Sequence, residues 1–109
     1  MSDHQPLDAD QFAAAEGVAD WRVVDGFARA VFSTGSFAAG VRLVQAIGAA
    51  ADAANHHPDV LLTYPRVAVR LVTHDADGLT TADVALAREI SALAAAQGAA
   101  ADTGAITSW

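Results

Sequence analysis

The sequence contains no cysteine, no lysine and only one methionine among its 109 residues. The absence of cysteine excludes a disulfide framework and thiolate chemistry. The six basic residues are all arginines, and 13 acidic residues outnumber them, which gives a formal net charge of −7. Because phosphates repel a chain of this charge, and because no basic patch is present, we expect no direct contact with nucleic acid.

Long apolar runs and targeting signals are also missing. No apolar run approaches the roughly 20 residues that a membrane-spanning helix requires, so we expect no membrane partner. Residues 1–7 lack the basic and apolar regions of a signal peptide, and His4 within them is expected to be solvated. A cytoplasmic location is therefore the default expectation.

Alanine is the residue type that the chain has in abundance, at 28 of 109 positions. Alanine favours helices and thin, closely packed layers over a bulky core. The length suits one domain, which we place over residues 1–98, and we expect the small, polar segment 99–109 to be a mobile tail. A thin core gains from further burial, so we expect a homodimer or homotetramer.

The order of expected elements follows from periodicity and turn signals. Short helical and strand patterns over about 9–17, 21–24 and 27–32 precede a long helical pattern over 37–54, in which one apolar face holds Phe37, Val41, Val44, Ile47 and Ala51. Two further strands over about 60–64 and 66–73 and a helix over about 81–97 complete the chain. The fold class predicted is α+β, order α-β-β-α-β-β-α, a four-stranded antiparallel sheet with three helices packed on one face.

Three of the four histidines lie in two short junctions between these elements. His56 and His57 follow the long helix, and His74 follows the last strand. Histidine titrates near neutral pH, so the cluster suits general acid–base catalysis. Two other interpretations remain: a metal site with Asp52, Asp59 or Asp75 as added ligands, and a histidine pair that only caps a helix end. Adjacent histidines rarely point into one coordination sphere, and the His spacing of a zincin is absent.

The spacing of these residues resembles the signature of the pterin-4a-carbinolamine dehydratase family. The resemblance covers about residues 5–96. It also includes Trp21 and the pair Phe32 and Phe37. Its central run is Asp52-x3-His56-His57-Pro58-x5-Tyr64-x9-His74-x8-Asp83, and a second block is Thr73-His74-Asp75-x2-Gly78-Leu79-Thr80-x2-Asp83.

The resemblance implies dehydration of a 4a-hydroxy-tetrahydropterin to the quinonoid dihydropterin, a step in pterin cofactor regeneration. By position, His57 would be the principal catalytic residue, and His56 and His74 would act as acids on the departing hydroxyl group. Residues that would bind the pterin or orient the imidazoles are Asp52, Asn55, Pro58, Val72, Thr73, Asp75 and Asp83. The resemblance implies no metal and no other cofactor, because the pterin is the substrate. The alternative function is a non-catalytic dimerisation or binding module on the same scaffold.

Overall fold

The computed structural model of the chain describes residues 4–109. The elements in chain order are α1 (Ala9–Ala14), β1 (Arg22–Val24), β2 (Phe27–Ser33), α2 (Phe37–Ala54), β3 (Asp59–Thr63), β4 (Arg66–Leu71), the 3₁₀ turn η1 (His74–Ala76), α3 (Thr81–Ala96), β5 (Ala100–Ala101) and the 3₁₀ turn η2 (Thr103–Ala105). All four strand pairings are antiparallel, so the α+β class is confirmed. The short β5, which we did not predict, adds a fifth strand beside β2.

The register of the sheet separates an inner face from an outer face. The strand order is β1-β2-β4-β3, and Ala30 of β2 lies opposite Val69 of β4, which lies opposite Val60 of β3. Since successive side chains alternate between faces, these residues point inward. Val67, Val69 and Leu71 of β4 are fully buried. On the outer face, Arg29 lies opposite Arg70 in the same way.

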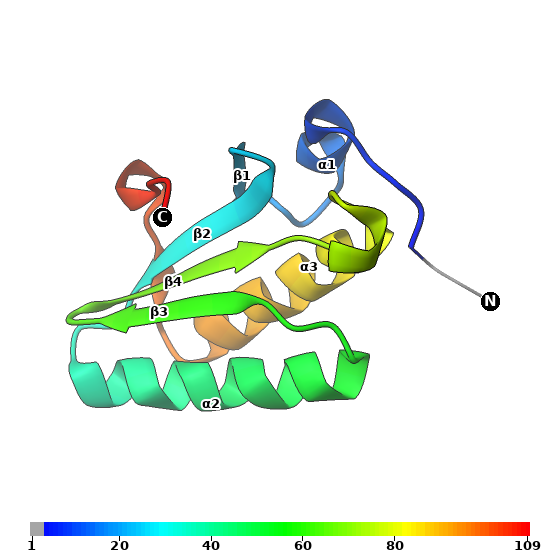
Figure 1. Ribbon diagram of the computed structural model, residues 1–109. Helices are drawn as coiled ribbons and strands as arrows, with labels where there is room; N and C mark the ends of the chain where they lie inside the picture. Colours follow the sequence, from blue (N-terminus) through cyan, green and yellow to red (C-terminus); the bar gives the residue numbers. More distant parts are fainter. Residues whose placement is uncertain (1–3) are drawn as a thin grey trace.

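The helices cover the inner face and complete one core, with α2 and α3 in contact (Figure 1). Phe12 of α1 belongs to the same core. The buried face of α2 matches the predicted one only in part. Ile47 and Ala51 are buried as expected, but Phe37 and Val41 are 51% and 41% exposed. Leu43 and Ala50, which the prediction left out, are buried instead. An alanine-rich helix offers two apolar faces, and only one of them packs on the sheet.

Helix α2 has the length and composition of a membrane-spanning segment, which the sequence analysis did not anticipate. It is 18 residues long, with a mean hydropathy of 1.2. Core helices of soluble proteins can have the same length and composition, and α2 packs against β3 and β4. This property is therefore weak support for a membrane role.

The segment after α3, predicted as a mobile tail, lies against the sheet instead. Residues 100–101 pair with β2, and the N–H of Asp102 donates to the carbonyl of Val31. Arg29, only 2% exposed, donates to the carbonyls of Val24, Thr107 and Trp109. The Trp109 ring stacks on the Arg70 guanidinium at 4.4 Å. Part of the outer face of the sheet is thus covered by the chain itself (Figure 1).

Candidate active site

A residue with a left-handed backbone conformation at the end of α2 directs the two histidines that follow it into different surroundings. Asn55 has φ 50° and ψ 42°, a conformation that asparagine tolerates better than most residues. The N–H of His56 then donates to the carbonyl of Ala51 at 3.1 Å, a bond five residues back that is typical of a helix end. The chain leaves the helix axis at this point, so His56 turns toward α3 and His57 stays outside.

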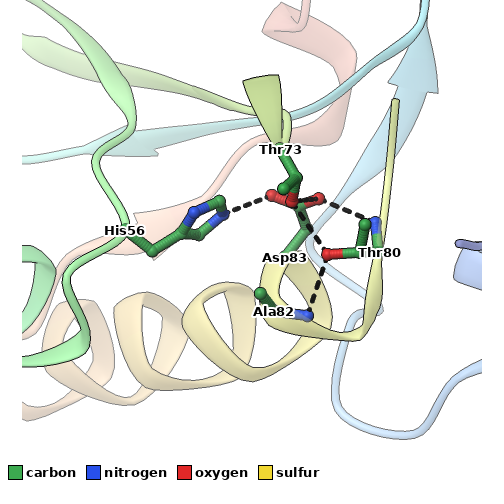
Figure 2. A network of polar contacts seen from close by, with 5 residues as sticks. All are labelled: His56, Thr73, Thr80, Ala82 and Asp83. Carbon is green, nitrogen blue, oxygen red and sulfur yellow. Dashed lines mark hydrogen bonds and ion pairs between the residues drawn. The ribbon is translucent and has the colours of Figure 1, made fainter. Parts of the chain in front are cut away.

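His56 makes a short contact with a carboxylate that is fully buried. Its Nε2 lies 2.6 Å from Oδ1 of Asp83, and the two side chains are 10% and 0% exposed. Figure 2 shows the His56 ring approaching from the α2 side while Asp83 rises from the first turn of α3. The pair therefore joins the ends of two elements that are 27 residues apart.

The second oxygen of Asp83 is held by two further donors. Oδ2 accepts from the Thr73 hydroxyl at 2.8 Å and from the N–H of Thr80 at 2.9 Å. The contact with Thr80 completes a capping box at the start of α3, with Asp in place of the usual Glu or Gln. Asp83 thus serves the helix cap and contacts His56 at the same time.

A pair of threonine hydroxyls extends this network. Oγ1 of Thr73 and Oγ1 of Thr80 lie 2.8 Å apart, and Thr80 Oγ1 accepts from the N–H of Ala82 at 3.2 Å (Figure 2). Thr73 and Thr80 are 3% and 0% exposed. The Thr73 side chain points into the protein toward Asp83, and this contact was not predicted from the sequence.

His57 lies in a different environment. Its Nε2 is 3.0 Å from Oδ1 of Asp52, and the two side chains are 59% and 81% exposed. Helical i, i+4 spacing would pair Asp52 with His56 only if the helix reached that residue. The helix ends at Ala54, and the left-handed turn at Asn55 brings His57 back to Asp52 instead.

The three predicted histidines border one cavity of about 180 Å³. Its walls come from the end of α2, the end of β4 and η1. Of the predicted binding residues, it includes Asn55, Thr73 and Asp75. The full set of lining residues is His4, Asn55, His56, His57, Thr73, His74 and Asp75.

The remaining candidates lie around this cavity rather than in its wall. Asp52 and Pro58 line a groove on the other side of His57, together with Val60. Val72 lines a separate hollow that includes the far side of His74. Asp59, considered as a metal ligand, is paired with Arg70 at 2.8 Å. Tyr64 is 72% exposed in the turn between β3 and β4.

One residue that lines the cavity was not predicted from the sequence. His4, expected to be solvated, borders this cavity and a second one of about 280 Å³, and its ring centroid is 6.2 Å from that of His56. The adjoining chain is held in place, because the N–H of Leu7 donates to Leu79 and the N–H of Thr81 donates to Gln5. No local sequence pattern reports a pairing of residues more than 70 positions apart.

The metal interpretation gains no support from the arrangement. Within residues 4–109, no three histidine or acidic side chains gather closely enough to form a metal-ligand group. Two acidic candidates have other partners: Asp52 contacts His57, and Asp59 pairs with Arg70. The geometry consists of two separate imidazole–carboxylate pairs beside one cavity, which suits proton transfer.

Comparisons with known proteins point to one family. The family model described as pterin 4 alpha carbinolamine dehydratase matches residues 5–93. A protein of Herpetosiphon aurantiacus with the provisional name pterin-4-alpha-carbinolamine dehydratase is 37% identical over 83 residues, 76% of this chain and 86% of its own. A protein of Cyanothece sp. with the same provisional name is 42% identical over 74 residues, 68% of this chain and 76% of its own.

A solved structure agrees with these relatives. The crystal structure of a transcriptional coactivator/pterin dehydratase from Brucella melitensis superposes with a TM-score of 0.74 at 27% identity, and the match covers 81% of this chain and 97% of that one. The matched family region, residues 5–93, contains His56, His57 and His74 together with the carboxylate partners of His56 and His57. The chain therefore belongs to the pterin 4 alpha carbinolamine dehydratase family.

Proposed function

We propose that the protein removes water from a 4a-hydroxy-tetrahydropterin and releases the quinonoid dihydropterin. The observation that supports this most strongly is the placement of three imidazoles around one cavity, two of them paired with carboxylates. In the reaction the bond from C4a to the hydroxyl oxygen breaks, that oxygen gains a proton and leaves as water, and a ring nitrogen loses a proton as a C=N bond forms. No electron acceptor is required.

Different imidazoles carry out the two proton transfers in this proposal. A protonated imidazole donates to the departing hydroxyl group, and a neutral imidazole accepts the proton from the ring nitrogen. In this proposal His57 is the principal catalytic residue, and His56 and His74 are the acids. Each positioned proton transfer typically contributes about 10²–10⁴ in rate. Asp52 and Asp83 orient the imidazoles that they contact.

The substrate would lie among the three imidazoles. Asn55, Thr73 and Asp75 border the cavity and offer main-chain and side-chain polar groups to the edge of a pterin ring. We propose no metal and no cofactor besides the pterin, which is the substrate. A cytoplasmic location and a role in pterin regeneration belong to the same proposal.

The direct test is dehydration of 4a-hydroxy-tetrahydropterin generated by a hydroxylase, followed by ultraviolet absorbance. We expect wild-type protein to exceed the spontaneous rate and His57→Ala to lose most of that increase. Leu61→Ala, an exposed apolar change on β3 away from the cavity, is the control and should keep wild-type turnover. A folded wild-type protein that gives no acceleration would contradict the proposal.

The alternative, a non-catalytic dimerisation or binding module, is favoured by one observation. Phe37 and Val41 form an exposed apolar stripe on α2, and such a stripe is typical of a contact surface. We propose that this stripe joins copies of the chain into a homodimer or homotetramer, which is compatible with either function. Sedimentation of wild type and Val41→Asp at micromolar concentration tests the assembly. Only an 11.1 kDa species in the wild type would contradict it.

A further inference from the structure

We propose that Thr73 and Thr80 are positioning residues that orient Asp83, so that neutral His56 carries its proton on Nε2 and reacts through Nδ1. The catalytic part of this inference rests on the proposed dehydratase function. The part that concerns the imidazole proton rests on the hydrogen-bond geometry alone, so the two can fail separately.

The order of donors along the network follows from what each group can donate. An ionised carboxylate only accepts, so Thr73 gives its single hydroxyl proton to Oδ2 of Asp83. Thr73 Oγ1 must then accept in its contact with Thr80 Oγ1, and Thr80 is the donor there. Thr80 Oγ1 in turn accepts from the N–H of Ala82. The chain of bonds therefore runs in one direction, from the N–H of Ala82 through Thr80 and Thr73 to Asp83.

The contacts of Asp83 leave one of its oxygens to His56. Asp83 lies in the first turn of a 16-residue helix, where the backbone dipoles stabilise anions. Its Oδ2 is occupied by Thr73 and by the N–H of Thr80, which leaves Oδ1 to His56. With an acceptor at 2.6 Å, His56 Nε2 must be the donor. The proton of the neutral imidazole is thereby assigned to Nε2.

The other ring nitrogen of His56 is open to a ligand. Within residues 4–109, Nδ1 of His56 makes no hydrogen bond. No side-chain polar atom of this part of the chain is both fully buried and unpaired, so Nδ1 is not fully buried. When His56 acts as an acid, the imidazolium gives the proton on Nδ1 to the departing hydroxyl oxygen and keeps the proton on Nε2. The carboxylate of Asp83, in contact with Nε2, stabilises the charged ring.

Thr73 is the member of the network that tests this assignment best. Thr73→Val keeps the shape of the side chain but removes one donor from Asp83 and the acceptor from Thr80. Thr73→Ser keeps the hydroxyl group and should restore the wild-type behaviour. Thr63→Val is the matched control, because Thr63 is an exposed strand threonine on β3. NMR of the imidazole nitrogens reports which nitrogen of His56 is protonated, and turnover is measured on the same four proteins.

In wild type, Thr73→Ser and Thr63→Val, we expect a neutral His56 with its proton on Nε2. In Thr73→Val, neutral His56 should become a mixture of molecules protonated on Nε2 and on Nδ1. The variant should also lower kcat about 10–100-fold with little change in KM, as loss of a partner that orients a histidine typically does. A proton on Nδ1 in the wild type would overturn the inference, even if Thr73→Val does not fold. So would a folded Thr73→Val with unchanged nitrogen shifts and kcat. Wild-type protein with the proton on Nε2 but without turnover would refute only the proposed function.

Discussion

Replacing Asp83 by asparagine should move the proton of neutral His56 from Nε2 to Nδ1. The change keeps the shape of the side chain, but it puts an amide where three donors now converge. If the amide oxygen stays with Thr73 and Thr80, the NH₂ group faces Nε2 of His56. Two donors would then oppose each other, and the imidazole must move its proton to Nδ1. The reacting nitrogen of neutral His56 would change from an acceptor to a donor.

The size of the effect on folding can be bounded from the same contacts. A hydrogen bond to a charged group contributes about 1.5–3 kcal/mol to the free energy of unfolding, and a neutral bond about 1 kcal/mol. Because Asp83→Asn weakens three bonds but removes none of the shape, we expect a loss of about 2–3 kcal/mol. Small domains have about 5–15 kcal/mol of stability, so the variant should remain folded. Asp83→Ala, which leaves all three donors unpaired, should lose about 3–5 kcal/mol.

Urea denaturation followed by circular dichroism measures the loss of stability, and pterin dehydration measures the loss of turnover. We expect turnover of Asp83→Asn to fall about 10²–10⁴-fold, the usual contribution of one positioned acid. Asp77→Asn is the matched control, because it removes the same charge at an exposed residue whose left-handed backbone also suits asparagine. A free energy of unfolding and a turnover equal to those of wild type in Asp83→Asn would refute the reasoning. They would mean that the short contact with His56 contributes neither to stability nor to catalysis.

Three further predictions concern other parts of the fold. His57→Ala should change the free energy of unfolding by less than about 0.5 kcal/mol, because the side chain is 59% exposed; a larger loss in urea denaturation would contradict a purely catalytic role. Trp109→Ala should lower stability by about 1–2 kcal/mol through loss of its stacking on Arg70, and unchanged unfolding would mean that the tail contributes nothing. Gly40→Ala should gain less than the about 1 kcal/mol that alanine normally adds inside a helix, because its Cβ would lie 2.6 Å from Cδ1 of Leu62 and that side chain would have to shift. A full gain of that size in urea denaturation would disprove the close packing.

The main elements of the fold could be predicted because each has a local signal. Strict alternation over residues 66–71 marks β4, and the Thr80 capping box marks the start of α3. The buried face of α2 could not be chosen in the same way. Both of its faces carry apolar residues, and only contact with the sheet decides that Leu43 is buried and Val41 is exposed.

The site was predictable as a cluster but not as a set of contacts. Histidines at two junctions identified the residues that border the cavity. Their carboxylate partners depend on one backbone angle at Asn55, which pairs Asp52 with His57 and leaves His56 to Asp83. His4 joins the cavity through pairing with a segment far along the chain. Long-range contacts of this kind leave no trace in local periodicity.

The way in which the tail is attached affects which of its residues can change. The family match ends at residue 93, so the tail is an extension beyond the shared region. Arg29 reaches two carbonyl oxygens there, and Val31 accepts from a main-chain N–H. Main-chain groups are the same whatever the side chain, so most positions from 103 to 107 should accept substitution freely. Selection on this segment would then act mainly on the ring of Trp109 and on the arginines beneath it.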